Sequence, residues 1–427
     1  MSEERVDFVV FGASGFTGQF VVEELARIVD EENSLTWAVA GRSMEKLQNV
    51  LKNASSRTGK NLESIPIFIA DISSESSIAD MCRQAKVVLN CVGPYRFYGE
   101  QLVKACIENG AHHLDISGEP QFLERMQLLY HGDAKKSNVY VVGACGFDSV
   151  PSDMGVTFMR KQLDGELNAV EFYVNIMNGS SGTAVNTGTL ESAVYGFHHS
   201  SELKPLRKSL FPTPLPRSLH KIKKRSLVFY NNDVNKWCLP FPGSDKSIIH
   251  RSVRYNYENK KQRPIQVNGY FCRPGFFEMI LLIIFGIIFG IMAKFSFTRS
   301  LLLKFPSFFS AGTFKNGGPS FKQIEESSFT INLFGEGYSK KLDDPDQPHE
   351  EAPDKRIVVK VSGPDAGYIA TPICMVQCAL TLLREKDKLP SGGGVYTTTA
   401  AFQDTSLTER LTKHNVKFEL VKIEDIK

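Results

Sequence analysis

Four residues along the first third of the chain have side chains suited to acid–base chemistry: Tyr95, Asp115, Glu119 and Asp148. Each lies just after a short apolar segment of the kind that forms a buried strand, and each could donate or accept a proton beside a reacting group. Such residues also serve as helix caps and loop hydrogen-bonders. We take Tyr95 and Asp148 as the candidate catalytic residues.

A glycine-rich turn supplies the clearest binding motif. An apolar run from Val6 to Phe11 leads into it, and an apolar-periodic segment from Phe16 to Val29 follows. Strand, glycine turn and helix is the context of a dinucleotide-binding fingerprint, in which glycines admit a pyrophosphate and the helix N-terminus attracts it. The alternative is a glycine turn that only packs a helix on a strand. The predicted cofactor-binding residues of this turn are Gly12, Ser14, Gly15, Phe16, Thr17 and Gly18.

The residues after the second predicted strand indicate which dinucleotide is bound. Leu35 to Ala40 is apolar and is followed by Gly41, Arg42 and Ser43. An acidic residue here would favour the ribose of NAD, whereas an arginine pairs with the 2′-phosphate of NADP. Arg42 and Ser43 therefore predict NADP in preference to NAD, unless Arg42 is only part of a solvated loop.

Two further loops are predicted at the same edge of the sheet. Asp71 follows the strand Ile65 to Ala70, where it either faces the adenine or caps the next helix. Asn90, Val92 and Gly93 end the fourth strand. Ligands of open α/β sheets bind at the carboxyl ends of the strands, so we include these four residues in the predicted cofactor site.

Other catalytic and metal-binding patterns are weak. Tyr257 and Lys261 have the Tyr-x-x-x-Lys spacing of short-chain reductases, but they lie in a polar run far from the glycine turn, and we attribute the match to chance. The two adjacent histidine pairs lack the spacing of metal ligands, and we predict no metal site.

Composition bounds the class of protein. The chain has 427 residues, 42% of them hydrophobic, and a net charge of +3, which is ordinary for a globular protein of two or three domains and gives no reason to expect nucleic acid. Eight scattered cysteines without a Cys-x-x-Cys motif fit a reducing compartment, and Cys374 and Cys378 are expected to pack in a core. The N-terminus has no features of a signal or transit peptide. A homo-oligomer is left open.

Strands and helices alternate regularly up to about residue 150, which predicts an α/β fold. We expect a Rossmann-type parallel sheet domain over residues 1–155 and a second α/β domain with a mixed sheet over 156–365. The segment 366–427 is expected to return to the Rossmann domain.

A long apolar run interrupts the second domain. Met279 to Ala293 contains 15 uncharged residues, and a second apolar cluster continues to Phe309. A bilayer span needs about 20 residues. A buried core helix, a single span, and a hairpin or interfacial helix in one leaflet are the alternatives, and the last fits best. We predict that residues 275–310 associate with a membrane or lipid droplet, and the basic run from Lys204 to Arg225 is either solvated surface or a contact for anionic headgroups.

Several motifs together resemble the animal saccharopine dehydrogenase-like oxidoreductases. They are Val9 to Phe20, Ala38 to Ser43, Val88 to Glu100, Asp115 to Phe122 and Gly363 to Pro372. The resemblance covers nearly the whole chain and implies a Rossmann domain, a second α/β domain, and association with lipid droplets and other membranes. The substrate residues of true saccharopine dehydrogenases have no match here, and the fold is also similar to bacterial trans-acting enoyl reductases of lipid synthesis.

These observations favour an NADP-dependent oxidoreductase that acts on an apolar or lipid-linked carbonyl or enoyl substrate. We expect it at the cytosolic face of a lipid droplet or membrane, with mitochondrial and endoplasmic reticulum membranes as further locations. The competing hypothesis is a nucleotide-binding lipid-droplet coat or scaffold protein without turnover, which the lack of a catalytic signature supports.

Overall fold

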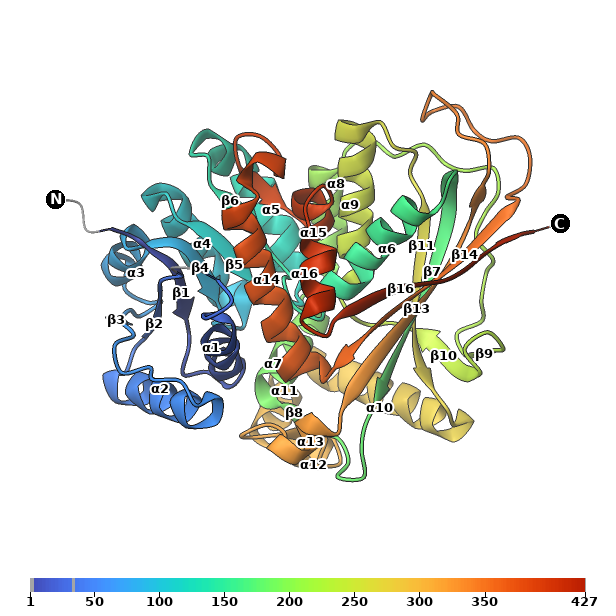
Figure 1. The fold of residues 1–427 in the computed structure, drawn as a ribbon. Coiled ribbons are helices and arrows are strands. Elements are labelled where there is room, and N and C mark those ends of the chain that lie inside the picture. The colour runs from blue at the N-terminus through green and yellow to red at the C-terminus, as the bar shows by residue number, and fades with distance from the viewer. Residues whose placement is uncertain (1–3, 33–34, 427) are drawn as a thin grey trace.

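The computed structural model describes residues 4–32 and 35–426, which form two seven-stranded sheets joined through shared helices (Figure 1). The first sheet is parallel throughout and has the order β15-β6-β5-β4-β1-β2-β3. Its strands are β1 (Val6–Phe11), β2 (Trp37–Gly41), β3 (Ile67–Ile69), β4 (Ala85–Asn90), β5 (His112–Asp115), β6 (Tyr140–Val142) and β15 (Gly394–Tyr396). The Rossmann-type parallel sheet predicted from the sequence is confirmed.

Side chains alternate between the two faces of this sheet. Phe8 and Val10 of β1 pack in one cluster with helices α1 and α14, whereas Val9 and Phe11 pack in another with α3 and α4. A strand buried on both faces reads as a continuous apolar run, which is why β1, β2 and β4 were recognisable. The helices of this domain are α1 (Phe16–Ile28), α2 (Met44–Thr58), α3 (Glu75–Arg83), α4 (Tyr95–Asn109), α5 (Pro120–Lys136) and α14 (Thr371–Arg384).

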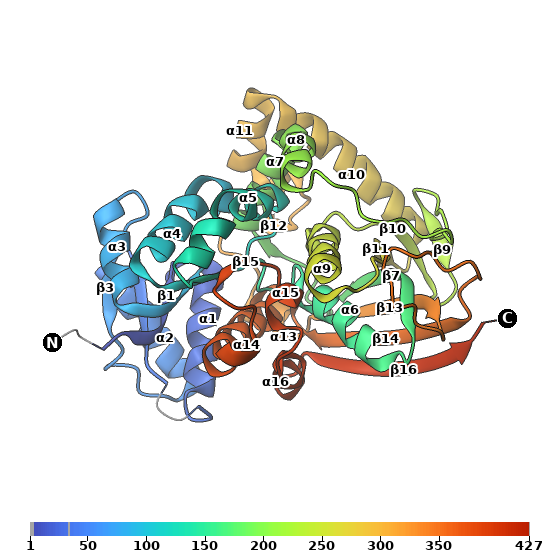
Figure 2. The same cartoon turned by 90° about the horizontal axis from the view of Figure 1, so that it is seen from above.

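The second sheet is mixed, as predicted, with the order β16-β14-β13-β7-β11-β10-β9. Only β7 and β11 pair in parallel. The strands are β7 (Glu166–Met177), β9 (Phe229–Asn231), β10 (Lys236–Pro240), β11 (Gln266–Arg273), β13 (Ser328–Tyr338), β14 (Lys355–Pro364) and β16 (Lys417–Asp425). Helices α6 (Val150–Gln162), α9 (Asp245–Lys260), α15 (Thr398–Phe402) and α16 (Leu407–Lys413) lie between the two sheets (Figures 1 and 2).

The C-terminal segment is divided between the sheets. Helix α14 packs on α1, and β15 extends the parallel sheet beyond β6, whereas β16 pairs with β14 of the second sheet. The expectation that residues 366–427 return as a whole to the Rossmann domain therefore misplaces the last strand. An exposed edge of β14 was available to it, and pairing there satisfies backbone groups that would otherwise face water.

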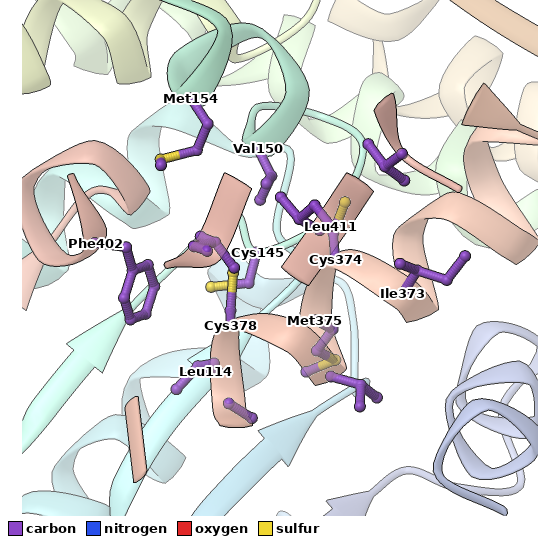
Figure 3. Close-up of a cluster of buried hydrophobic side chains, with 14 of the residues drawn as sticks. Leu114, Cys145, Val150, Met154, Ile373, Cys374, Met375, Cys378, Phe402 and Leu411 are labelled. Carbon is purple, nitrogen blue, oxygen red and sulfur yellow. The ribbon is translucent and has the colours of Figure 1, made fainter. Parts of the chain in front are cut away.

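One apolar core runs through both domains, and α14 lies at its centre (Figure 3). Cys374 and Cys378 of this helix are fully buried free thiols beside Cys145, which fits the core role expected from their spacing. Helix α14 was also long and apolar enough, together with the preceding π-turn Ala366–Ala370, to resemble a membrane span, but most of it is buried inside the protein. The two domains are thus held by continuous packing rather than by a flexible linker.

Helices α7 (Thr187–His198), α8 (Leu203–Leu210), α10 (Phe276–Lys294) and α11 (Ser296–Lys304) lie together on one side of the molecule (Figure 2). The short elements β8 (Val185–Asn186), α12 (Pro306–Phe309), β12 (Phe314–Lys315) and α13 (Phe321–Glu325) complete the described part of this domain. Helix α10 packs on α7 through Phe289 and Ala293, which meet Leu190 and Val194.

The outer face of α10 is apolar and exposed. A stripe at spacings of three and four residues has between 48% and 80% of each side chain exposed; it comprises Phe277, Leu281, Ile284, Ile288, Ile291 and Phe295. We call these six residues the α10 stripe. The alternative of a buried core helix is therefore wrong, because only one side of α10 meets the protein. The helix has 19 residues and is, by length and composition alone, sufficient to span a bilayer.

Phe329 of β13 tests the shared core. Its side chain is fully buried, and its ring meets that of Phe147 edge to face with 4.8 Å between centroids. We expect Phe329→Ala to lower the free energy of unfolding by about 3–5 kcal/mol, because it leaves a cavity where the sheet of the second domain meets the first. Urea unfolding followed by circular dichroism measures this. Phe308→Ala, at a phenylalanine that is 81% exposed, is the control and should shift stability by less than about 0.5 kcal/mol; equal effects of the two changes would contradict a shared core.

Candidate functional site

The glycine turn brings the start of α1 very close to the end of β1. Gly12 has φ +82°, and its N–H donates to the carbonyl of Ala40 over 2.9 Å. A Cβ atom at Gly12 would lie 2.7 Å from Val92 Cγ2, and one at Gly18 would lie 2.3 Å from the carbonyl oxygen of Gly12. Only glycine fits either position. At Gly12 the positive φ disfavours other residues, and at Gly18 the obstructing atom belongs to the backbone.

This packing leaves the N-terminus of α1 open to a ligand. Gly15 is the N-cap residue, is exposed, and provides no side chain to cap the helix. The first N–H groups of a helix carry partial positive charge and bind anions. Ser14 lies half-buried in the same turn, and Thr17 lines the cavity between the domains. The shape of the glycine turn therefore fits a pyrophosphate, as the predicted cofactor site requires.

Phe16 has a different role from the other turn residues. Its ring meets Tyr368 edge to face at 4.9 Å between centroids and Phe20 at 5.5 Å. Tyr368 belongs to the π-turn that precedes α14, so Phe16 links the glycine turn to the C-terminal part of the chain. It supports the binding turn by packing.

Arg42 lies directly beyond β2, with its side chain exposed at the carboxyl edge of the sheet. Ser43 is the N-cap of α2 and accepts a hydrogen bond from the main chain of Lys46 over 3.4 Å. A guanidinium at this edge suits the 2′-phosphate of NADP.

Asp71 lies close enough to Arg42 for their charges to interact. Hydrogen bonds from the main chain and hydroxyl of Ser73 hold the pKa of Asp71 below its usual range, and the charge of Arg42 lowers it further. The N-cap of α3 is Ser74, which accepts from the main chain of Ser77. Asp71 thus does not cap this helix, in contrast to the alternative interpretation. Its hydrogen bonds with Ser73 hold it at the carboxyl edge of the sheet, where the cofactor is predicted to bind.

Asn90, Val92 and Gly93 shape the loop after β4. The side chain of Asn90 is buried; its Oδ1 accepts from the N–H of Val92 over 3.0 Å, and its Nδ2 lies 3.3 Å from His113 Nε2. Val92 packs against Gly12, and Gly93 is exposed. The side chain of Asn90 therefore holds the loop, and the ligand-facing surface is left to Val92 and Gly93.

A cavity of about 310 Å³ lies between the two domains, next to the start of α1. The first domain contributes Thr17, Ile116 and the segment 146–148, and the second contributes Ile176, Asn178 and the start of the β8–α7 segment. The chain just before α14 closes it with Asp365, Tyr368 and Thr371. The cavity therefore adjoins the dinucleotide-binding turn without being part of it.

Asp148 faces this cavity, so that solvent reaches its side chain although protein surrounds it on the other sides. This enclosure raises the pKa of the Asp148 carboxyl, because the charged form is poorly solvated. Behind it, Ser244 donates to the Asp148 carbonyl over 3.2 Å, and buried Asp245 has its pKa raised to about 7 by burial and by the charge of Asp148. Of the two candidate catalytic residues, Asp148 is the one that lines the cavity.

Tyr95 does not line the cavity. Its side chain is buried, its hydroxyl donates to the carbonyl of Asn90 over 3.0 Å, and burial raises its pKa well above the usual value. Glu119 accepts from the N–H of Tyr95 over 2.9 Å and pairs with Arg96 at 3.1 Å. These contacts give Tyr95 and Glu119 structural roles at the start of α4, since cap bonds of this kind fix a helix N-terminus. The sequence interpretation of Tyr95 as a proton donor thus differs from its place in the structure.

Asp115, the fourth sequence candidate, is also buried outside the cavity. Its Oδ1 accepts from the N–H groups of Ser117 and Ala144 over 2.9 and 3.1 Å, and burial raises its pKa to about 7. It joins the loops after β5 and β6.

Two cavity residues escaped the sequence reasoning. Asp365 accepts from the N–H of Tyr368 over 2.7 Å, and Tyr368 accepts from the N–H of Asn186 over 2.9 Å. Both lie far along the chain, in the motif Gly363 to Pro372, which resembles the family but carries no predicted role. The sequence signal for them is an aspartate and a tyrosine, in Asp-Ala-Gly-Tyr, just before an apolar helix. Within residues 4–32 and 35–426, no group of three or more His, Cys, Asp or Glu side chains could hold a metal ion.

Comparison with known proteins identifies the cofactor. Residues 8–142 match the family described as saccharopine dehydrogenase NADP binding domain. NADP is therefore the cofactor of the first domain, as predicted. The glycine turn and Arg42 are the residues predicted to contact its pyrophosphate and 2′-phosphate.

Relatives that match the whole chain show the family of both domains together. The human saccharopine dehydrogenase-like oxidoreductase is 48% identical over 100% of both chains, and a Caenorhabditis elegans protein named lipid droplet localized protein is 43% identical over 97% of this chain and 98% of its own. The apo structure of saccharopine dehydrogenase (L-Glu forming) from Saccharomyces cerevisiae superposes with a TM-score of 0.56 and 12% identity over 98% of this chain and 100% of that one, which shows the fold. By identity over its full length, the chain belongs to the saccharopine dehydrogenase-like oxidoreductase family.

Proposed function

We propose that the protein is an NADP-dependent oxidoreductase that works at a lipid surface on an apolar or lipid-linked carbonyl or enoyl substrate. The observation that carries the proposal is Asp148, a carboxyl facing a cavity that adjoins the dinucleotide turn. Bound NADPH supplies the hydride in such chemistry, and the protein needs to orient the substrate and provide a proton. Family membership and the NADP-binding domain support the oxidoreductase class.

Asp148 would hold the exchanged proton. Because burial raises its pKa, the carboxyl retains a proton to higher pH than an exposed aspartate and is a better base when ionised. Asp245, buried behind it, interacts with its charge and accepts a hydrogen bond from Ser152, while Ser244 donates to the Asp148 carbonyl. Mostly uncharged cavity residues such as Phe147 and Ile176 suit an apolar substrate.

The lipid-surface location rests on the α10 stripe. A monomeric protein rarely exposes so many large apolar side chains on one helix unless they meet a partner or a membrane. Since the inner side of α10 packs on α7, the helix lies along the protein, which favours docking into one leaflet over spanning the bilayer. The name of the nematode relative supports a lipid droplet as the surface.

The alternative is a nucleotide-binding coat protein without turnover, in which Asp148 would take no part in a reaction. NADPH consumption at 340 nm with lipid extracts distinguishes the two, provided that Asp148→Asn is tested alongside. Turnover that the substitution abolishes supports the enzyme, whereas tight NADPH binding with no turnover in any extract supports the coat protein.

Gly18→Ala tests the binding turn. The new Cβ would overlap the Gly12 carbonyl, so the helix N-terminus must shift away from the pyrophosphate. We expect NADPH affinity, measured by quenching of protein fluorescence, to fall at least about tenfold, which is about 1.4 kcal/mol. Gly196→Ala in α7 is the matched control, since nothing lies within 4 Å of its added Cβ and affinity should be unchanged. An unchanged dissociation constant for both variants would show that the turn does not bind the cofactor.

Arg42→Ala tests the preference for the phosphorylated dinucleotide. Hydrogen bonds to charged groups contribute about 1.5–3 kcal/mol, so we expect the dissociation constant for NADPH to rise about 10- to 100-fold. NADH lacks the 2′-phosphate, and its affinity should change less than about twofold. Parallel titrations of the two dinucleotides give the comparison, and an equal loss for both would refute the assignment of Arg42.

The α10 stripe is tested by the pair Ile284→Glu and Ile288→Glu. Each side chain that enters hydrocarbon contributes about 1.5–3 kcal/mol, so we expect binding to triacylglycerol droplets coated with phosphatidylcholine to fall at least about tenfold in flotation assays. NADPH affinity should be retained. The matched control is Leu219→Glu with Leu227→Glu, at two leucines that are 60% and 66% exposed outside α10. If both pairs float like the unaltered protein, α10 is not the docking surface.

A further inference from the structure

The charges around the cavity between the domains are all of one sign. Asp148 contributes a carboxylate from the first domain, and Asp365 contributes one from the chain before α14. Among the described residues that line this cavity, none is lysine, arginine or histidine. The other lining residues are apolar or neutral, so the cavity presents negative charge on an otherwise uncharged wall.

The Asp148 carboxylate has no partner within the described part of the chain. No described residue donates a hydrogen bond to it, and burial alone accounts for its raised pKa. The nearest comparable carboxylate, Asp245, is itself negative when ionised and accepts a hydrogen bond from Ser152. Because Asp148 is exposed to the cavity, water reaches its carboxylate, and a ligand that donates a hydrogen bond can take the place of that water.

Asp365 differs from Asp148 because neighbouring groups donate to its carboxylate. Its Oδ1 accepts from the N–H of Tyr368 over 2.7 Å, Ser327 and the N–H of Gly367 also bond to it, and burial raises its pKa despite these bonds. The hydroxyl of Tyr368 is held by the N–H of Asn186, which fixes the geometry of this wall. Two carboxylates therefore face one cavity without a cation between them.

We propose that the cavity takes a ligand whose polar end donates hydrogen bonds and carries no negative charge, either a hydroxyl group or a protonated amine, on an apolar body. This rests on the proposed function, because it assigns the substrate class of the same cavity. A ligand with carboxylate or phosphate groups here would meet Asp148 and Asp365 with no basic side chain to offset the repulsion. Substrates with several carboxylates are therefore excluded.

The volume sets the size of the bound part. About 310 Å³ lies at the lower end for small-molecule pockets, which suits a six-membered ring or a short aliphatic segment. Small rings are also suitable probes, because they do not form micelles and so do not report on the α10 stripe. Cyclohexylamine, cyclohexanol and cyclohexanecarboxylate share one ring and differ only in the polar group.

Saturation-transfer difference NMR on the full chain saturated with NADP⁺ at pH 7.5 compares these three probes. We expect the amine or the alcohol to bind at least tenfold more tightly than the carboxylate, and whichever is tighter identifies the polar end. A carboxylate that binds as tightly as both others would overturn the proposal, as would failure of all three to bind.

Substitutions locate the binding. Asp148→Asn and Asp365→Asn should each lower the affinity for cyclohexylamine at least tenfold and reduce the difference in affinity between the amine and the carboxylate. The control is Asp343→Asn, at an exposed aspartate outside the cavity, which should leave the affinities for all three probes unchanged. A preference that survives both cavity substitutions would overturn the assignment. A thermal melt of each variant checks that it is folded.

Separate measurements distinguish failure of this inference from failure of the proposed function. NADPH binding and oxidation are measured separately, without the probes. If NADPH neither binds nor is consumed but the free protein still prefers amine or alcohol over carboxylate, the proposed function fails and this inference stands. If NADPH is bound and consumed while the carboxylate binds best, only this inference fails.

Discussion

The contact between the backbone of Gly12 and the start of α1 at Gly18 is the constraint on which the rest of the site depends. A methyl group at Gly18 would push the helix away from the strand, and one at Gly12 would collide with Val92 in the loop after β4. Close approach places the open helix N-terminus at the carboxyl edge of the sheet, sets Thr17 at the cavity and turns Phe16 towards Tyr368. The binding turn, the cavity wall and the returning C-terminal chain are thus positioned by one steric fit.

Helix α7 connects this site to the lipid-facing layer. Before its first turn, β8 lies at the cavity and pairs with β12, where the chain returns from α10–α12. Its middle contacts the first domain, because Ser192 donates to Glu119 over 2.9 Å and Tyr195 meets Phe97 at 4.8 Å. Its far side supports α10 through Val194. Packed elements therefore connect α10 with the wall of the cavity.

The sequence was most informative where local pattern and burial coincide. The buried strands of the Rossmann sheet, the turn at Gly12 and the position of Arg42 follow from apolar runs and glycine spacing. Long-range pairing was less accessible: nothing local to residues 417–425 distinguishes an edge of one sheet from an edge of the other. The cavity residue Asp365 was missed for the same reason, since the fold brings it to the same cavity as Asp148 from more than 200 positions away.

Hydrophobicity alone also could not assign α10, because an all-apolar helix has no polar face to indicate its orientation. Its contacts with α7, β10 and β11 show which side is inward. Tyr95 illustrates the converse limit. A phenol beside a ligand-binding edge fits catalysis by type and position, yet its hydroxyl is bonded to the Asn90 carbonyl and buried. Asp148, two strands further along the chain, has a similar position after a strand but presents an unpartnered carboxylate to a cavity. The distinction between a structural and a chemical side chain therefore depends on what satisfies its polar atoms, and that depends on tertiary packing.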